Sequence, residues 1–223
     1  MALTRPKSLK ELALEHLRES IIDGTLAMGQ TLSERGISED LGVSKSPVRE
    51  ALAQLRDEGL VNIEPQKGVR VFTLSEEEVA QICDFRQAIE SAAFELALER
   101  NPAGLAKDMK DNVSAMTVAR KNGDTKQYLA LDTAFHQLIF KHAGNAYLAS
   151  SYERYLGKIA ALRTHLSGLP KHTDLSYLEH GKLADAVRTK DMPEIRRLLA
   201  EHIDRTREAY SIAIDRGQSS AAE

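Results

Sequence analysis

The chain has 223 residues, of which 42% are hydrophobic, so it is long enough for two modest domains with packed cores. Its formal net charge is −3, and division at Thr73 leaves residues 1–73 with 10 basic and 11 acidic side chains and residues 74–223 with 20 and 22. Neither part is basic overall, so a DNA-binding function would depend on where single basic residues lie. The single cysteine, Cys83, excludes an intrachain disulfide. No stretch has the pattern of a membrane span or a signal segment, and we therefore expect a cytoplasmic protein.

Residues 1–73 are expected to form three helices followed by two short strands. Apolar residues recur at helical spacing after serines that can cap a helix, and glycines stand where each helix should end. The helices are expected after Ser8, Ser33 and Ser44, with ends at Gly24, Gly42 and Gly59. The residue types at 60–63 and 69–72 predict strands, with a hairpin turn at 65–68 between them. This order of elements predicts a winged helix-turn-helix domain over residues 1–73.

Residues 74–223 are predicted to be helical throughout. Ser75 and Glu78 form a capping box that opens a helix to about Arg100, and Asn101-Pro102 starts the next one. A turn at 122–124 separates two further helices, and additional helices are expected at about 145–167, 174–190 and 193–215. Only the final residues, GQSSAAE, have the composition of a disordered tail. We therefore predict a mainly α-helical chain whose second domain, residues 74–223, is a bundle of about six helices.

The third predicted helix has the composition of a recognition helix. Its first turn offers Ser44, Lys45, Ser46 and Arg49, while later apolar residues face inward. Hydroxyl groups and a helix N-terminus bind phosphate, and lysine or arginine can reach O6 and N7 of guanine in the major groove. Lys67, at the tip of the predicted hairpin, would act with its neighbours as a wing on the DNA backbone or minor groove. The alternative is a winged helix that makes only protein contacts.

The run LSERGISEDLGVSKSPVREALAQLRDEGLV, followed by GVRVF, strongly resembles the DNA-binding domain of the GntR superfamily. The resemblance implies a transcription regulator whose DNA contacts are Arg35, Lys45, Arg49 and Gly68, assisted by Ser44 and Ser46. Two positions matter for this comparison. Lys45 stands where arginine or lysine is usual, and a lysine there would not make a bidentate contact. Ile37-Ser38 replaces the common Leu-Ala pair, a packing change that we expect to be harmless.

Four potential metal ligands face the interior of the predicted bundle. A helical angle of roughly 100° per residue places Asp132 and His136 on an apolar arc of one helix, His180 on that of a second and His202 on that of a third. Asp132 and His136 lie one helical turn apart, close enough to share an ion. One carboxylate with three imidazoles suits Zn, Ni, Mn or Fe, and leaves open positions for water or an anionic ligand. The alternative is that each histidine is a separate, hydrogen-bonded core residue and that Asp132 pairs with Arg86.

Arg86 also falls on an apolar arc, and Glu90 lies one turn later on the same arc. An inward-facing arginine near a metal would be a good clamp for a carboxylate or a phosphate. The candidate effector-binding residues are therefore Arg86, Glu90 and Arg163, with Arg163 the next candidate if Arg86 is not the clamp. A simple internal ion pair between Arg86 and Glu90 is the alternative.

The C-terminal residues resemble the FadR C-terminal domain (FCD) branch of the same superfamily. The matching segments are FRQAIESAAFELA, LDTAFHQLIF and EHGKLADAVRTKDM, followed by the helix that contains His202. The resemblance implies that the metal ligands are Asp132, His136, His180 and His202 and that Arg86 contacts the effector. It also implies a homodimer that binds a pseudo-palindromic operator, often as a repressor, and releases DNA when a carboxylate-bearing metabolite binds. Fatty-acyl-CoA sensing occurs in this family without metal, and the intact Asp/His set points away from it.

Two other functions compete with a metabolite-controlled regulator. A metal-dependent hydrolase would use the same centre to activate water, but no additional base is evident and an enzyme would not explain the N-terminal DNA reader. A pure metal sensor would change its DNA affinity in response to metal alone. We therefore predict a DNA-binding regulator that is not an enzyme, with the metal as a standing part of its effector pocket.

Overall fold

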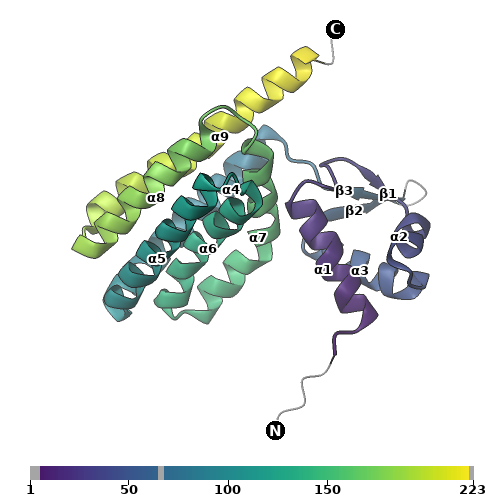
Figure 1. The fold of residues 1–223 in the computed structure, drawn as a ribbon, viewed down its shortest axis with the longest axis horizontal. Coiled ribbons are helices and arrows are strands. Elements are labelled where there is room, and N and C mark those ends of the chain that lie inside the picture. Colours follow the sequence, from purple (N-terminus) through teal and green to yellow (C-terminus); the bar gives the residue numbers. More distant parts are fainter. Residues whose placement is uncertain (1–5, 65–67, 221–223) are drawn as a thin grey trace. The chain divides into compact units, whose positions relative to one another are not determined.

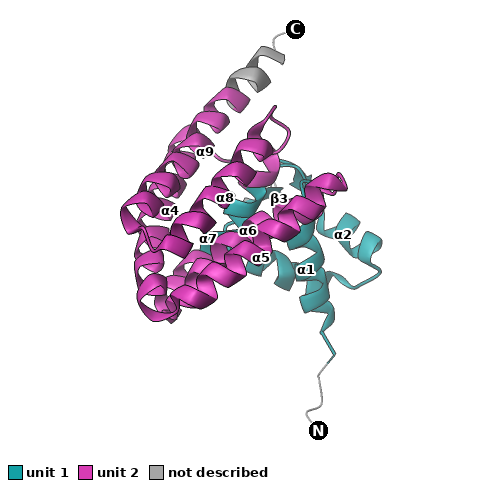
Figure 2. Cartoon of the chain, turned by 60° about the vertical axis from the view of Figure 1, so that its left-hand side comes forward, with its two compact units in different colours: residues 1–73, 154–161 teal, residues 74–153, 162–223 magenta. Residues whose placement is uncertain are grey.

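The computed structural model describes residues 6–64 and 68–220, which form nine helices and three strands (Figure 1). The chain divides into two compact units (Figure 2). Unit 1 comprises residues 1–73 with 154–161, and unit 2 comprises residues 74–153 with 162–223. None of the helices in the described part of the chain combines the length and the apolar character that a bilayer span requires. The predicted fold class, mainly α-helical with an N-terminal winged helix-turn-helix, is confirmed.

Unit 1 begins with three helices, α1 (Leu9–Ile22), α2 (Glu34–Leu41) and α3 (Lys45–Asp57). Ser8 and Ser33 accept hydrogen bonds from backbone N–H groups in the first turns of α1 and α2, as predicted. The apolar faces of α1 and α3 pack together, and their buried side chains include Leu14, Leu17, Val48, Leu52 and Leu55. Because this face of α3 is buried, the opposite face is left in solvent.

Three short strands complete unit 1, namely β1 (Thr31–Leu32), β2 (Val61–Glu64) and β3 (Gly68–Val71). They form an antiparallel sheet in the order β1-β3-β2, with Leu32 opposite Val69 and Asn62 opposite Arg70. The two strands of the hairpin were predicted, each displaced by one residue, whereas β1 was not. Two residues are too few to show an alternating pattern, so only the pairing with β3 reveals this strand.

Unit 2 contains six helices, as predicted, except that residues 154–161 of α7 belong to unit 1. They are α4 (Glu76–Arg100), α5 (Pro102–Lys121), α6 (Thr125–Ala143), α7 (Ala146–Leu166), α8 (His172–Thr189) and α9 (Met192–Ser220). Helix α6 packs against α4 and α5, α9 packs against α4 and α8, and α8 also packs against α5. The core of the bundle includes Phe94, Met109, Phe135, Ile139, Leu183 and Leu199. Helices α4, α6, α7, α8 and α9 contribute the polar side chains buried within it.

Two helix bounds differ from the prediction. Helix α8 starts at His172 rather than at Asp174, and the residue before it, Lys171, has a φ of 63°, in the left-handed region. Helix α9 continues to Ser220 and so includes part of the GQSSAAE segment that was predicted to be a disordered tail. No proline follows the apolar repeat of α9, and the glycine in that segment does not end the helix. Residues 221–223 lie outside the described residues.

Candidate DNA-binding surface and metal centre

The N-terminal end of α3 presents polar side chains to solvent. Gly42 ends α2 with a φ of 63°, a left-handed conformation that suits glycine and allows a tight turn between α2 and α3. Val48 of α3 is buried, whereas Ser44, Lys45 and Ser46 are exposed. The Ser44 side chain makes no capping hydrogen bond with α3, which leaves its hydroxyl available to another partner. This end of α3 therefore has the polar, exposed character of a recognition helix.

The two arginines predicted to contact DNA lie in exposed ion pairs. Nε of Arg49 is 2.7 Å from Oε2 of Glu34, and Nε of Arg35 is 2.7 Å from Oε1 of Glu39. Exposed pairs of this kind contribute about 0–1 kcal/mol to stability. Either guanidinium can therefore exchange its carboxylate for a phosphate or the edge of a base at little cost.

The hairpin between β2 and β3 corresponds to the predicted wing. Gly68 opens β3 with a φ of 90°, a conformation that strains any residue with a Cβ atom. Among the described residues, no neighbouring atom lies within 4 Å of where that Cβ would be. Glycine is therefore needed here for the backbone conformation rather than for space. Lys67, predicted to be at the tip of the wing, lies outside the described residues.

Three of the four predicted metal ligands meet in the interior of unit 2. His136 lies on α6, His180 on α8 and His202 on α9, and none is more than 3% exposed. One ring nitrogen of each lies within 4.8 Å of the other two, and the Nε2 atoms of His136 and His180 are 3.3 Å apart. Two nitrogens bound to one tetrahedral metal at about 2.0–2.1 Å lie roughly 3.3–3.4 Å apart. The spacing of His136 and His180 therefore fits a shared divalent ion, and a ring nitrogen of His202 lies within 4.8 Å of both.

Asp132, the fourth predicted ligand, lies beside the three histidines. Its Oδ2 accepts a hydrogen bond from the Ser176 hydroxyl at 3.1 Å and lies 3.9 Å from Nδ1 of His180. Its Oδ1 lies 2.8 Å from Nε of Arg163, close enough for an ion pair, yet it accepts no well-directed hydrogen bond from the described residues. This oxygen keeps a lone pair for a further partner. Asp132 thus pairs with Arg163 and not with Arg86, the partner that the alternative interpretation supposed.

Two further carboxylates orient the imidazoles. Oε2 of Glu90, on α4, lies 2.7 Å from Nδ1 of His136, and Oε2 of Glu179, on α8, lies 2.7 Å from Nδ1 of His202. A proton on each Nδ1 would complete these hydrogen bonds and leave Nε2 to face an ion. The sequence analysis missed Glu179. Its side chain reaches across from α8 to α9, and helical periodicity within α8 does not reveal such a contact.

Burial keeps the three imidazoles neutral at pH 7. It lowers the pKa of His180 to about 3 and the pKa of His136 well below its usual value. It also lowers the pKa of His202, against the opposing effect of its hydrogen bond to Glu179. Burial by itself raises the pKa of Asp132, but the neighbouring imidazoles and the guanidinium of Arg163 outweigh it and hold this pKa below its usual range. An ionised carboxylate and neutral imidazoles are the forms that bind a divalent metal.

Arg86 and Glu90 form a buried ion pair along one side of α4. Nε of Arg86 lies 2.7 Å from Oε1 of Glu90, and the two side chains are 2% and 0% exposed. Nη2 of Arg86 also lies 3.4 Å from the ring nitrogens of His136. The carboxylate of Glu90 therefore joins Arg86 to His136. This is the internal pair that the sequence analysis kept as the alternative to effector binding, and neither residue lines the cavity beside the histidines.

Arg163, by contrast, lines a small cavity beside the histidines, which His202 also lines but His136 and His180 do not. The cavity has a volume of about 10 Å³, and its lining also includes Asp132, His202 and Arg205. Nη2 of Arg163 and Nδ1 of His180 are buried and have no hydrogen-bond partner within the described residues. Buried polar atoms in proteins are nearly always satisfied. These atoms therefore indicate that the site takes a polar partner, such as a metal ion, a water molecule or an anion.

Comparison with known proteins assigns the chain to a family. The model for bacterial regulatory proteins of the gntR family matches residues 9–71, and the FCD domain model matches residues 81–205. The chain belongs to the GntR family. It is a DNA-binding transcription regulator with an FCD domain, which confirms the two resemblances found in the sequence.

Relatives of this GntR-family regulator match it along most of its length. It is 30% identical to an uncharacterized HTH-type transcriptional regulator in an unstable DNA locus of Streptomyces ambofaciens, over 91% of this chain and 85% of the relative. It is 28% identical to the gluconate operon transcriptional repressor of Bacillus subtilis, over 84% of this chain and 79% of the relative. The crystal structure of a GntR transcriptional regulator from Rhodococcus sp. RHA1 matches 92% of this chain and 99% of its own, with a TM-score of 0.81 at 21% identity, and so shares the fold. The two curated relatives are named as transcription regulators, which confirms the predicted class of a regulator and not an enzyme.

Proposed function

We propose that this regulator holds a divalent metal ion in unit 2 and that a small carboxylate effector, bound beside the ion, controls its affinity for an operator. His136, His180 and His202 would hold the ion, with Asp132 as the fourth ligand. When bound, the ion supplies a centre of positive charge with open positions for oxygen ligands. The observation that carries the proposal is the convergence of three buried, neutral imidazoles whose nitrogens lie within 4.8 Å of one another.

Charge balance around the histidines favours an anionic effector. Three guanidiniums face three carboxylates in ion pairs, and the pairs are Arg86–Glu90, Arg163–Asp132 and Arg205–Glu179. The imidazoles are neutral, so this set carries no net charge before metal binds. A divalent ion would add two positive charges to a poorly solvated site, and an anion would compensate them. The B. subtilis relative is named for the gluconate operon, and gluconate is itself a small carboxylate.

Arg163 is better placed than Arg86 to bind the effector. Its Nη2 is buried without a partner, and its side chain lines the cavity that also contains Asp132 and His202. Arg86 already has Glu90 as its counter-charge. In the proposed arrangement a carboxylate bridges the ion and Arg163, while Glu90 holds His136 in place and Arg86 balances Glu90.

The proposal places DNA recognition on unit 1. The contacts would come from Arg35, Ser44, Lys45, Ser46 and Arg49, and from Lys67 and Gly68 in the wing. One recognition helix reads few base pairs, so useful specificity needs two copies on two half-sites and therefore a homodimer. A ligand changes operator affinity only if it binds the DNA-bound and free conformations of that dimer unequally.

Elemental analysis of protein purified without a His tag tests the metal centre. The wild type should carry about one equivalent of a divalent metal per chain, as expected for a single tetrahedral site. His202→Ala should carry much less, because it removes one of three nitrogen ligands. His165→Ala is the matched control, since His165 is an exposed histidine of the same unit. A wild type that is isolated without metal, and takes up neither Zn²⁺ nor Ni²⁺ on titration, would contradict the proposal.

The effector is tested by fluorescence anisotropy with an operator selected from random DNA. A panel that includes lactate, gluconate and citrate should contain a carboxylate that lowers operator affinity of the metal-loaded wild type. Arg163→Met should keep its metal and its operator affinity but lose this response, because it lacks the proposed clamp. A normal response in Arg163→Met would show that the effector is held elsewhere.

A pure metal sensor is the second candidate function, and the small size of the cavity favours it. A volume of about 10 Å³ leaves room for little more than a water molecule beside the histidines. A metal sensor would change its operator affinity as buffered free Zn²⁺ or Ni²⁺ rises, with no carboxylate present. The proposed regulator would keep a constant operator affinity in that titration and respond only after the carboxylate is added.

A further inference from the structure

The cavity that His202 lines is separated from two surface clefts by the first turn of α8 together with Tyr128 and Arg205. One cleft, of about 170 Å³, shares Tyr128 and Thr173 with the lining of the cavity. A second cleft, of about 210 Å³, shares His172 and Arg205 with it. His172 and Thr173 belong to the first turn of α8. This turn, with Tyr128 and Arg205, therefore separates the cavity from both clefts, and a carboxylate larger than the cavity could not enter without displacing some part of this lining.

Side chains of two neighbouring helices hold this turn in place. The backbone carbonyl of Thr173 accepts a hydrogen bond from the hydroxyl of Tyr128, on α6, at 3.0 Å and from Nη1 of Arg120, on α5, at 3.1 Å. Nη2 of Arg120 lies 2.5 Å from Oδ1 of Asp174. The same guanidinium lies 4.5 Å from the centre of the Tyr177 ring. Arg120 and Tyr128 thus fasten the start of α8 onto α5 and α6.

Helix α8 lacks the local cap found on the other helices of unit 2. The N-termini of α4 to α7 are capped by Ser75, Asn101, Asp124 and Asn145, and that of α9 by Asp191. The corresponding residue of α8 is Lys171, which makes no capping hydrogen bond through its side chain and has a φ of 63°. A missing cap weakens the first turn of a helix, and a left-handed conformation strains a residue that has a side chain. The position of this turn therefore depends on Arg120 and Tyr128, and on Arg205 of α9, whose Nη1 lies 3.4 Å from the carbonyl oxygen of His172.

We propose that the first turn of α8, His172–Leu175, is the gate of the metal and effector site, and that Arg120 and Tyr128 are its latch. This inference rests on the proposed function of unit 2. The gate opens when the Thr173 carbonyl loses its two side-chain donors, which joins the cavity to the cleft of about 170 Å³.

The side of the gate that faces Arg205 is less able to open. Arg205 forms an ion pair with Glu179, and Glu179 holds Nδ1 of His202 at 2.7 Å. Displacement of Arg205 would therefore disturb a metal ligand. Within the described residues, Arg120 and Tyr128 donate no hydrogen bond to the three histidines, so their release of the gate breaks no contact of a histidine ligand.

Movement of the gate would be transmitted directly to the site. Ser176, next to the gate, donates a hydrogen bond to Oδ2 of Asp132 at 3.1 Å, and His180 follows one turn later on the same helix. A ligand that favours one position of the gate therefore also favours one position of α8. Such unequal contacts with two conformations are what allosteric control requires.

The rate of Zn²⁺ release tests the gate. The full chain is loaded with Zn²⁺ and mixed with an excess of a chromogenic chelator in a stopped-flow instrument. Arg120→Ala should release Zn²⁺ at least about tenfold faster than wild type, because a charge-assisted hydrogen bond and an ion pair are lost. Tyr128→Phe, which removes one hydroxyl and conserves the ring, should release it about fivefold faster. Binding should accelerate in proportion, so the equilibrium affinity for Zn²⁺ should stay nearly unchanged.

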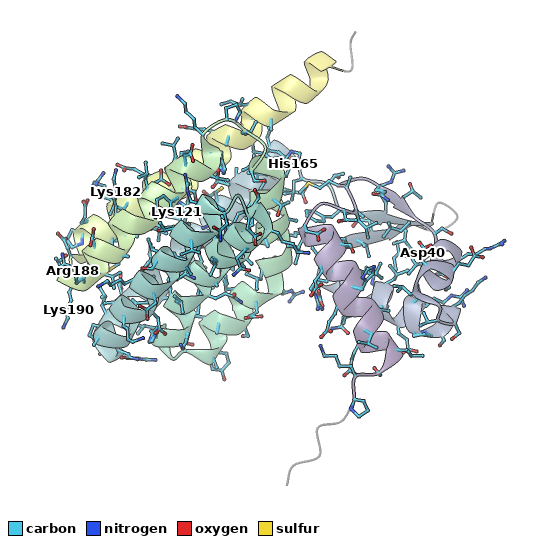
Figure 3. The ribbon with its side chains drawn as sticks, viewed as in Figure 1. Asp40, Lys121, His165, Lys182, Arg188 and Lys190 are labelled. Atoms are coloured by element: carbon cyan, nitrogen blue, oxygen red, sulfur yellow. The ribbon has the colours of Figure 1, made fainter. Side chains whose placement is uncertain are left out.

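Arg188→Ala is the matched control. Arg188 is an exposed arginine in the last turn of α8, paired with Asp185 and labelled in Figure 3. Its loss should leave the release rate as in wild type. Wild-type release rates in both Arg120→Ala and Tyr128→Phe would overturn the gate. Faster release with a proportional loss of affinity for Zn²⁺ would also overturn it, because these residues would then only stabilise the bundle. A wild type that binds no Zn²⁺ at equilibrium would overturn the metal centre and the gate with it.

Discussion

Glu90→Gln should destabilise unit 2 of the metal-free protein by about 3 kcal/mol, at the low end of the range for breaking a buried ion pair. Glu90 is fully buried, and its carboxylate lies 2.7 Å from both Nε of Arg86 and Nδ1 of His136. Glutamine keeps the shape and one acceptor oxygen but removes the charge, so the guanidinium of Arg86 is left in the interior without a counter-charge. Glu95→Gln is the matched control, because Glu95 pairs with Arg196 at the surface and its loss should cost less than about 1 kcal/mol.

Urea denaturation followed by circular dichroism, with EDTA present, measures this difference. With a slope of about 2 kcal/mol/M, a loss of 3 kcal/mol lowers the midpoint by roughly 1.5 M. The double variant Arg86→Met/Glu90→Gln should recover most of the loss, because no unpaired charge is then buried. Equal midpoints for Glu90→Gln and Glu95→Gln would refute the reasoning, since the interior would then tolerate an unpaired guanidinium.

Other properties follow from the same geometry. Arg49→Ala should weaken operator binding by about 1–3 kcal/mol if the Arg49 side chain contacts a base. Arg56→Ala, at the far end of α3, should leave the operator affinity measured by anisotropy unchanged. Equal losses of affinity in the two variants would mean that only the general positive charge of α3 matters. Burial, with the charge of Arg205, lowers the pKa of His172 from 6.5 to about 4. Between pH 6.5 and pH 4 the unfolded chain therefore binds a proton on this residue that the folded chain does not bind. The metal-free protein should therefore lose stability as pH falls from 6.5 towards 4. In His172→Gln the melting temperature should change less with pH over this range than in wild type. The same dependence of melting temperature on pH in both proteins would assign the effect to another group. Zn²⁺ at about 100 times its Kd should add about 2.7 kcal/mol to the free energy of unfolding of wild type but not to that of His136→Ala. Equal gains in the two proteins would contradict the role of His136 as a metal ligand.

Local signals in the sequence were sufficient to predict most of the fold. Ser8, Ser33 and Ser75 cap their helices, because a cap depends only on residues within one turn. The inward positions of His136 and His180 were also predictable, since the angle around a helix shows which residues share a face with apolar neighbours. Their burial is confirmed, whereas their role as metal ligands stays a prediction.

Contacts between helices were beyond this kind of prediction. Helical angles placed Arg86, Asp132 and Glu90 in the interior but gave no means to decide which guanidinium meets which carboxylate. The structure pairs Arg86 with Glu90, four residues away on the same helix, and Asp132 with Arg163 on another. Glu179 shows the same limit, because its contact with His202 joins two helices and leaves no mark on the periodicity of either. Such pairings depend on how the helices pack, which a single sequence does not specify.

The hydroxyl groups of two buried tyrosines provide a matched test of whether this interior is complete without a ligand. Tyr152 is 1% exposed and stacks on Phe140 at 4.4 Å, but its hydroxyl has no hydrogen-bond partner within the described residues. The hydroxyl of Tyr128 donates to the carbonyl of Thr173 at 3.0 Å. In the metal-free protein, Tyr152→Phe should leave the free energy of unfolding unchanged or slightly higher, whereas Tyr128→Phe should lower it by about 0.5–1.5 kcal/mol. Urea midpoints measure both variants under the same conditions. Equal losses would show that the Tyr152 hydroxyl has a partner in solution. Burial raises the pKa of this hydroxyl and Arg163 opposes that rise through its charge and a side-chain contact, so the guanidinium of Arg163 is the first candidate partner. A water molecule or an anion held with this arginine is the second, and loss of the effector response in Tyr152→Phe would assign the position to the effector.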